Sequence, residues 1–529
     1  MLQSCRKTCI VVLLLAGSMA GQYAPGDFDQ LVVRQLGSSK VREHLFYLTD
    51  AVGPRVVGSP ALETARGWLE TRLKEYGLQS IRREENPPMQ IAPGVTWNPK
   101  GWSWARLVVQ QLSPWPATLI GVPVLYSPSM NGPRRGEVII APLPPPERSA
   151  IASFVAQYRG KLKGKFLLAQ SGERGIPREN RPTVHRYTDA EMREFESAPT
   201  ASPKPAPAPA ARTTPTSPAQ NPPRFEETLA AFADLHKFLQ QEEVLGIVGA
   251  ARGEGGTLFV RPPAAPPIVS IEPPPTFDLA AEHYNRIIRL VQHGVPVRID
   301  ADLQTEFYGS GTVNLLAEIP GMGKRDEVVI AGAHLDSWHG GTGATDNAAN
   351  VAVLLETARI LAASGVHPRR SIRFAFWDGE ELGTVGSRGY AALHLVDPKS
   401  GEKKREHEDT SCYFNLDFGG GRIRGVYLQG RTELQPIFAS WLGRVAGEKL
   451  VASPRTTLGS DQATFERAGL PGISFIQDPL DYMLRTNHTT MDVSDYISTD
   501  DLNHNVRVLA NLLLEAANAD EKLPREAGR

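Results

Sequence analysis

The sequence predicts an α/β protein in which a mostly parallel mixed sheet is flanked by helices and carries an inserted β-rich domain. From about residue 276 to the C-terminus, short apolar runs such as 328–330 and 372–376 alternate with segments of helical periodicity. This alternation is typical of parallel sheets that are buried on both faces. Between residues 97 and 275, short β-like runs broken by prolines replace that pattern. These two sequence patterns predict two structural units.

The composition is that of an ordinary globular protein. The chain has 529 residues, 41% hydrophobic and 22% charged, which is enough for two or three domains with sizeable cores. Lys and Arg number 57 against 58 Asp and Glu, so no basic surface predicts nucleic acid as a partner. Of three cysteines, only Cys412 lies outside the N-terminal segment, and we expect no disulfide in the mature chain.

Residues 1–20 have the pattern of a secretory signal peptide. Arg6 and Lys7 precede an apolar run over 9–16. Ser18-Met19-Ala20 then resembles a signal-peptidase cleavage site, in which two small residues flank a third residue. The run is shorter than the ~20 residues that span a bilayer. We therefore expect cleavage and export to the periplasm or the medium, with no stable membrane insertion afterwards.

Residues 21–96 are expected to form the N-terminal helical part of the main domain. Ser59 can cap a helix, and Pro60 suits its first turn. Apolar residues then recur at helical spacing until Tyr76-Gly77, at Leu62, Ala65, Leu69 and Leu73.

The middle domain, 97–275, is expected to contain several short strands and a helical segment. The helix is predicted at 226–241, and the strands at 118–125, 137–141, 166–169 and 244–248. Residues 199–223 are nearly all Pro, Ala, Ser, Thr or Lys, which predicts an exposed disordered insertion. The Pro-rich stretch 262–275 is expected to mark the boundary to the main domain, 276–529.

Polar residues follow each buried strand of the main domain. Open sheets bind ligands beyond the carboxyl ends of their strands, so these residues should converge at one edge. Singly, each is more often a cap or a solvated loop residue; jointly, two histidines and several carboxylates from separate parts of the chain predict a site. They are His334, Asp336, Asp346, Glu380, Glu381, Asp417 and His488.

Imidazole and carboxylate without thiolate form a ligand set suited to catalytic zinc. Two zinc ions need about six ligand contacts, which five residues supply if one carboxylate bridges the metals. Glu380, adjacent to Glu381, could then move a proton. Asp336, two residues after His334, is placed to orient that imidazole rather than to bind metal.

At these positions the chain resembles the secreted zinc-dependent peptidases of the M28 family. The resemblance covers roughly 277–498, and 53–59 is similar to the opening of the family. The matching blocks are 333–338 (AHLDSW), 343–347 (GATDN), 379–381 (GEE), 415–417 (NLD), 459–461 (GSD) and 488–490 (HTT).

The resemblance implies two zinc ions per chain and a role for each residue. His334, Asp346 and Asp417 would hold one zinc, and Asp346, Glu381 and His488 the other. Glu380 would be the general base.

The sequence leaves the roles of three further residues near the site undecided. Tyr482 stands where relatives place a tyrosine near the substrate carbonyl, so it either stabilises an oxyanion or only packs. Gln462 and Asn487 stand where many relatives have histidine, which bears on specificity without removing a ligand.

Residues 160–169 and 246–250 are similar to the protease-associated domain that these peptidases carry as an insertion. In the family this domain has no catalytic role and shapes access to the site. The stretch 199–223 is an added feature of this chain.

The expected function is hydrolysis at the end of a peptide, with aminopeptidase first and dipeptidase or carboxypeptidase second. A single-zinc glutaminyl cyclase is disfavoured because both His334 and Asp417 are present. A non-catalytic binding module, as in receptor-like relatives, would have lost metal ligands. Side-chain preference and oligomeric state are not indicated by the sequence.

Overall fold

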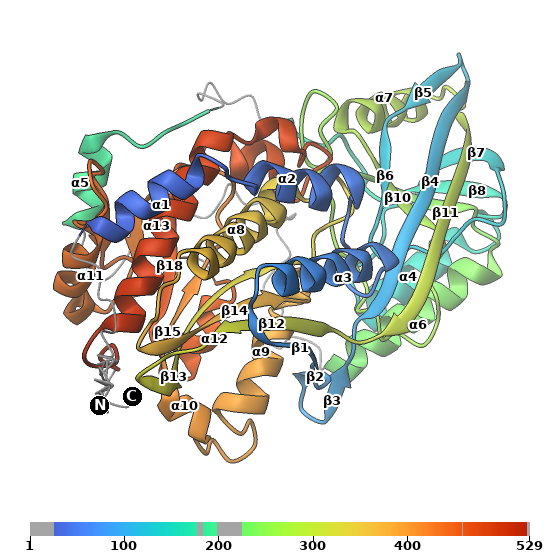
Figure 1. The fold of residues 1–529 in the computed structure, drawn as a ribbon. Helices are drawn as coiled ribbons and strands as arrows, with labels where there is room; N and C mark the ends of the chain where they lie inside the picture. The colour runs from blue at the N-terminus through green and yellow to red at the C-terminus, as the bar shows by residue number, and fades with distance from the viewer. Residues whose placement is uncertain (1–25, 177–183, 198–224, 458, 526–529) are drawn as a thin grey trace, which may run out of the picture.

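The computed structural model describes residues 26–176, 184–197, 225–457 and 459–525. It contains two eight-stranded sheets, which we call the first and the second sheet. Figure 1 shows the first sheet beneath the N-terminal and C-terminal helices and the second at the opposite end of the molecule. The expected signal peptide, 1–20, and the Pro/Ala-rich stretch, 199–223, lie outside the described residues.

The first sheet is mixed, with four parallel strands at its centre. Its parallel strands are β14, β13, β15 and β18, and every residue of β14 and β15 is buried. Buried parallel strands are what the apolar runs predict, and the prediction is confirmed. In spatial order the strands are β1 (Gln79–Glu85), β12 (Val313–Ile319), β14 (Arg370–Trp377), β13 (Lys324–His334), β15 (Thr410–Asn415), β18 (Gly472–Gln477), β16 (Ile423–Tyr427) and β17 (Val451–Ser453).

Helices cover both faces of this sheet. One face lies under α8 (Ala349–Ala363) and α13 (Thr499–Asn518), which also pack against each other. The same core includes α1 (Asp27–Leu36), α2 (Val41–Phe46) and α11 (Gln435–Leu442). The other face packs against α9 (Val385–Tyr390), α10 (Arg405–Asp409) and α12 (Gln462–Arg467).

The predicted N-terminal helix is α3 (Pro60–Glu75). The Ser59 side chain accepts a hydrogen bond from the Leu62 amide at 3.2 Å, which is the expected cap. The four predicted core residues, Leu62, Ala65, Leu69 and Leu73, are all fully buried. The helix prediction is therefore confirmed, including its start. A small hairpin, β2 (Met89–Ala92) and β3 (Val95–Trp97), follows β1.

The second sheet continues well past residue 275, where the sequence placed a boundary. After the Pro-rich stretch, β10, a helix and β11 all belong to this unit. The side chains of Ile299, Ala301 and Leu303 on β11 are buried in its core, which explains why the chain returns to it. In spatial order the strands are β5 (Ala117–Leu119), β4 (Lys100–Ser113), β11 (Arg298–Ser310), β7 (Arg134–Ile140), β8 (Lys165–Leu168), β9 (Gly246–Ala250), β10 (Thr276–Leu279) and β6 (Gly121–Pro123).

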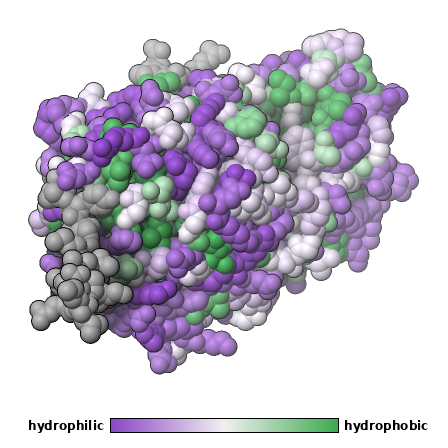
Figure 2. Space-filling model, viewed as in Figure 1, coloured by the Kyte–Doolittle hydropathy of each residue, from purple (hydrophilic) through white to green (hydrophobic). Residues whose placement is uncertain are grey.

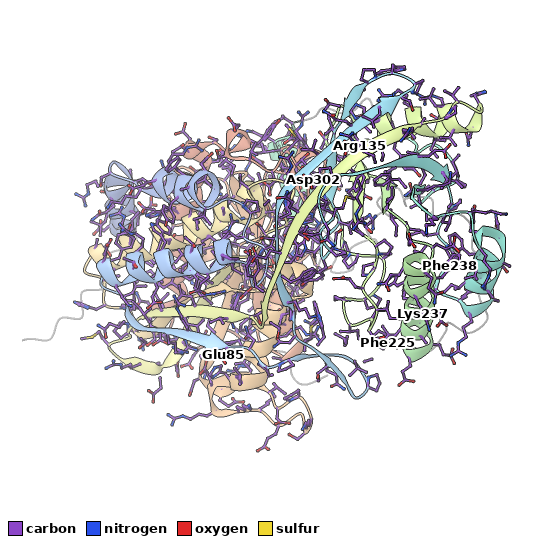
Figure 3. All side chains as sticks on the ribbon, turned by 90° about the vertical axis from the view of Figure 1, so that its right-hand side faces the viewer. Glu85, Arg135, Phe225, Lys237, Phe238 and Asp302 are labelled. Atoms are coloured by element: carbon purple, nitrogen blue, oxygen red, sulfur yellow. The ribbon has the colours of Figure 1, made fainter. Side chains whose placement is uncertain are left out.

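Three helices cover the second sheet. One core contains residues of α4 (Arg148–Tyr158) and α6 (Phe225–Gln241), and another contains those of α7 (Ala281–Gln292). Figure 3 shows α6, marked by Phe238, apart from the helices of the first sheet, with the long strands β4 and β11 between them. The predicted helix at 226–241 is confirmed as α6, and the predicted strands correspond to β5 to β9.

The surface is largely polar on the one face that Figure 2 draws. On the face drawn in Figure 2, hydrophilic residues predominate and hydrophobic ones form separate small groups. Among the described residues, no helix combines the length and apolar character needed to cross a bilayer.

Candidate metal centre

The carboxyl end of β13 delivers His334 into a group of carboxylates. The Nδ1 atom of His334 lies 3.0 Å from the carbonyl oxygen of Asp336, so Nδ1 carries the proton. Its Nε2 atom lies 3.0 Å from Oδ1 of Asp417 and 3.2 Å from Oδ1 of Asp346. Such an imidazole, oriented by a backbone carbonyl, has the geometry of a metal ligand.

A second group of the same kind surrounds His488. Its Nε2 atom lies 3.1 Å from Oε2 of Glu381 and 3.3 Å from Oδ2 of Asp346. Asp346 therefore directs one carboxylate oxygen toward each histidine. Glu381 Oε1 is buried and has no hydrogen-bond partner among the described residues. A buried carboxylate oxygen without a donor fits a missing cation.

The two groups concentrate negative charge in a buried place. Burial alone would raise the pKa of Asp346, but hydrogen bonds from His334 and His488 hold it well below its ordinary value. Burial and the nearby Asp346 carboxylate raise the pKa of Glu381 to about 7. The Glu381 and Asp346 carboxylates raise the pKa of His488 to about 11 against the effect of its burial. Divalent cations would relieve this repulsion, so the donor set fits zinc.

Glu380 lies beside the first group. Its carboxylate and ligand atoms of His334 and Asp417 are all within 4.8 Å of one another. Burial, with the charge of Asp417, raises the pKa of Glu380 well above its ordinary value. A carboxyl group with a raised pKa can both take and give a proton near neutral pH.

Asp336 supports both sides of the centre. Its Oδ1 atom accepts hydrogen bonds from the amides of Gly379 at 2.9 Å and Glu380 at 3.1 Å, and Oδ2 accepts one from Glu381 at 3.2 Å. Its carbonyl oxygen accepts from Nδ1 of His334, and its Oδ1 atom lies 3.6 Å from the same nitrogen. The side chain also fixes the turn that carries the two glutamates.

Tyr482 and Asn487 approach the centre from the loop after β18. The Asn487 side-chain amide donates to Oδ2 of Asp346 at 2.8 Å and to the Tyr482 hydroxyl at 3.0 Å. Burial, reinforced by the Asp346 charge, raises the pKa of Tyr482 well above its ordinary value. The hydroxyl therefore keeps its proton and can donate it in a hydrogen bond.

The comparison with known proteins agrees with this geometry. Residues 314–513 match the model of peptidase family M28. This part of the chain belongs to that family. All the histidines and carboxylates described above lie inside the matched region.

Curated relatives cover part of the chain. Human carboxypeptidase Q is 27% identical over 254 residues, 47% of this chain and 51% of that protein. Leupeptin-inactivating enzyme 1 of Streptomyces exfoliatus is 34% identical over 175 residues, 32% of this chain and 37% of that enzyme. The chain thus aligns with about half the length of carboxypeptidase Q.

Solved structures match nearly the whole chain. A peptidase M28 precursor from Shewanella amazonensis has a TM-score of 0.63 at 21% identity, covering 94% of this chain and 98% of its own. The zinc aminopeptidase BSAP from Bacillus subtilis has a TM-score of 0.54 at 17% identity, covering 92% and 96%. These likenesses confirm the predicted fold class.

Several residues that shape the M28 centre have no assigned role in the sequence analysis. Asp492 accepts hydrogen bonds from the Thr345 amide at 2.6 Å, the Thr345 hydroxyl at 2.7 Å and the Asp346 amide at 3.2 Å. The Ser460 hydroxyl donates to Oδ2 of Asp417. Ser460 lay in a matched block, whereas Asp492 lies two residues after the block 488–490 and was not singled out.

Arg55 and Asp461 are fully buried charges of the same region. Arg55 donates to the carbonyl oxygens of Leu335 at 2.9 Å and Gly343 at 2.8 Å, which ties the segment after β13 to the N-terminal part. The Asp461 carboxylate is 0% exposed, and burial raises its pKa to about 7. Both residues lay in blocks singled out by resemblance, without an assigned role.

Proposed function

We propose that this chain is an exopeptidase that uses two zinc ions and acts as an aminopeptidase. The observation that carries the proposal is the position of Asp346, which directs one oxygen toward His334 and the other toward His488. A carboxylate so placed would supply one oxygen to each of two metal ions, as carboxylates do in two-metal hydrolytic sites.

The ligands divide into two sets that share Asp346. His334 and Asp417 complete one set, and Glu381 and His488 complete the other. Bound zinc lowers the pKa of a water molecule and polarises the substrate carbonyl. Two further carboxylates support these ligands from outside the two sets. Asp336 accepts a hydrogen bond from the Glu381 amide, and Asp492 accepts one from the Asp346 amide.

The proton transfers fall to Glu380. With its pKa raised by burial, Glu380 takes the proton of the attacking water and gives it to the leaving amine. Tyr482 keeps its hydroxyl proton, so it can donate a hydrogen bond to the oxyanion. Asn487, which contacts the Tyr482 hydroxyl, holds that side chain beside Asp346.

Buried carboxylates support the choice of an aminopeptidase. A free α-amino group is a cation, and Glu381 and Asp346 place negative charge where that group would bind beside a metal. The name of BSAP, a zinc aminopeptidase, is consistent with this choice. Similarity to carboxypeptidase Q over 47% of the chain keeps dipeptidase or carboxypeptidase activity as the second candidate.

The first test measures metal and activity together. The purified protein should contain about two zinc per chain. Glu380→Ala should retain the zinc and the fold but lose roughly 100-fold or more of the activity, since general acid–base catalysis contributes about that much. Glu380→Gln is the matched control for volume. An active Glu380→Gln enzyme would contradict the role of Glu380.

A substrate panel separates the two candidate activities. Aminoacyl-nitroanilides, their N-blocked equivalents and free dipeptides should be compared with and without a chelator. Chelator-sensitive cleavage of the unblocked aminoacyl compounds supports the aminopeptidase. Cleavage confined to dipeptides would replace that proposal with the dipeptidase.

We also propose that the first 20 residues direct export. Their basic start and apolar run support a cleavable signal. N-terminal sequencing of protein recovered from outside the cytoplasm should begin near residue 21, and a mature N-terminus at Met1 would contradict it.

A further inference from the structure

Residues 184–197 lie far from the unit that precedes and follows them in the chain. They come between β8 and α6 of the second sheet, yet α5 (Asp189–Glu196) packs beside β17 at the far edge of the first sheet (Figure 1). Met192 is buried in a small core with Val451 and Ile476. The segment is therefore anchored on the M28 domain.

The start of this segment clamps the loop that follows β18. His185 and Leu480 exchange two backbone hydrogen bonds, of 3.0 and 2.8 Å. Arg186 Nη1 lies 3.1 Å from Oδ2 of Asp478, and its Nη2 lies 2.6 Å from Oδ2 of Asp501 at the start of α13. Asp478 is 1% exposed, so this ion pair is shielded from water on one side.

The other end of the same loop is held by a different part of the inserted region. The amide of Val260 donates to the carbonyl oxygen of His488 at 2.8 Å, and the Thr490 amide donates to the carbonyl oxygen of Leu258 at 2.9 Å. His488 itself has a φ of 56°, a conformation that a residue with a side chain adopts only when its surroundings hold it there.

We infer that the inserted region is a two-point clamp that positions the catalytic loop 478–490 of the M28 domain. The loop carries Tyr482 and His488, and both of its ends are bonded to segments of the insertion, 185–187 and 258–260. Arg186 is the positioning residue of the first clamp, because it joins the loop to α13. The catalytic part of this inference rests on the proposed function.

The loss of Arg186 should loosen the loop without emptying the metal centre. Without the guanidinium, the buried carboxylate of Asp501 loses its partner, while Asp478 keeps Arg424 at 3.2 Å. The loop should then open locally more often, because local opening depends on the few contacts that hold a segment. Tyr482 and His488 would spend less time in the productive geometry.

The experiment combines hydrogen exchange with kinetics on the full chain. In Arg186→Ala, amides of 479–488 should exchange about tenfold faster, while those of β13 and α8 stay unchanged. With the substrate that the panel identifies, kcat/KM should fall between about tenfold and about 100-fold, as expected for a displaced catalytic group. Zinc content should stay near two per chain.

Three variants make the result specific. Arg193→Ala removes an exposed arginine of α5 for which the described residues provide no ion pair within 4 Å, and it should match the wild type in both readouts. Arg186→Lys should recover part of the loss, since one ammonium can pair with one of the two carboxylates. Arg186→Gln keeps most of the side-chain length and serves if Arg186→Ala does not fold.

Each outcome decides the inference. Unchanged exchange at 479–488 in Arg186→Ala overturns the clamp, and so does an increase spread equally over the whole M28 domain. Faster local exchange in a protein whose wild type cleaves nothing supports the clamp and refutes the proposed function. The two failures are thus distinguishable.

Discussion

The two sheets share a plan and differ in chemistry. Each has eight strands, and each has four parallel strands side by side: β14, β13, β15 and β18 in the first, and β7, β8, β9 and β10 in the second. In the first sheet these strands end at or just before His334, Asp378, Asp417 and Asp478; in the second they are followed by Ala141, Ala169, Ala251 and Ala280. The parallel edge offers a place for a site, and the residues after the strands decide whether one exists.

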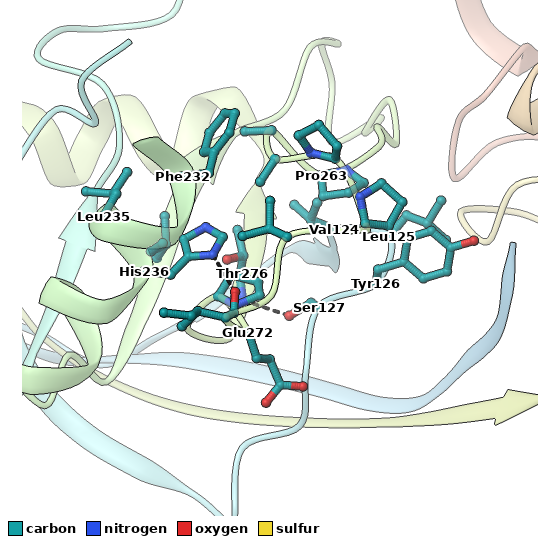
Figure 4. A pocket seen from close by; sticks show the side chains of 18 of the residues that line it. Val124, Leu125, Tyr126, Ser127, Phe232, Leu235, His236, Pro263, Glu272 and Thr276 are labelled. Carbon is teal, nitrogen blue, oxygen red and sulfur yellow. Dashed lines mark hydrogen bonds between the residues drawn. The ribbon is translucent and has the colours of Figure 1, made fainter. Parts of the chain in front are cut away.

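The unit built on the second sheet has a cavity, whereas the first sheet carries the candidate metal centre. The cavity is about 290 Å³ and lies between α6 and the turns at 263–273 (Figure 4). Its lining is largely apolar; His236 is there, with Nδ1 2.8 Å from the carbonyl oxygen of Ile271 and a pKa lowered by burial. Among the described residues, both groups of side chains close enough to hold a metal belong to the first sheet.

Removal of the shared carboxylate should have the largest effect. Asp346→Ala should lose most of both zinc ions and reduce activity by about 1,000-fold or more, because in the proposed centre one side chain serves both sets of ligands. His236→Ala, at the second sheet, should change neither quantity. Metal analysis and initial rates check this, and an Asp346→Ala protein that keeps two zinc ions would refute the bridge.

Loss of the Asp336 side chain should have a smaller effect. Asp336→Ala frees three backbone amides of the turn 379–381, and we expect metal affinity or activity to fall between about tenfold and about 100-fold. Asp302→Ala removes a carboxylate of the second sheet that pairs with Arg106 at 2.8 Å, and it should leave kinetics unchanged. Equal kinetic losses in both variants would contradict the contrast between the sheets.

Mild acid should lower the free energy of unfolding through a buried histidine that joins the two units. His339 follows β13, and its Nε2 donates to the carbonyl oxygen of Pro123 in β6 at 2.8 Å. Burial lowers its pKa to about 4 from 6.5. Below pH 6.5 the unfolded chain gains a proton that the folded chain refuses, so the free energy of unfolding should fall by up to about 3 kcal/mol toward pH 4.

Urea unfolding at pH 7 and pH 4 measures this loss. His339→Gln can keep the donor to Pro123 but cannot titrate, so its loss between the two pH values should be smaller by about that amount. His44, which is also buried with a pKa lowered to about 3, contributes in the same direction and remains in both proteins. Equal pH dependence in the two proteins would exclude His339 as a source.

Filling the cavity of the second sheet should have the smallest effect. Leu235→Phe adds volume to a wall of the cavity, and we expect the free energy of unfolding to change by about 1 kcal/mol or less. Zinc content and kcat/KM should stay at the wild-type values. A change in kinetics would show that the cavity communicates with the metal centre.

The sequence by itself determined the local elements and the kind of chemistry. The cap at Ser59 and the periodicity from Leu62 predict α3, and the apolar runs predict β13 and β14, because these signals depend on residues close in the chain. The identity of residues after the strands predicted a centre of histidine and carboxylate. The structure brings those seven residues together at one edge.

Only the tertiary structure decided what holds that centre in place. The hydrogen bonds of Asp492 to Thr345 and Asp346 join residues nearly 150 positions apart, and Arg186 reaches Asp478 and Asp501 about 300 positions away. The return of β11 to the second sheet is of the same kind. No periodicity or motif encodes such contacts, because they depend on the path of the whole chain, which local sequence does not specify.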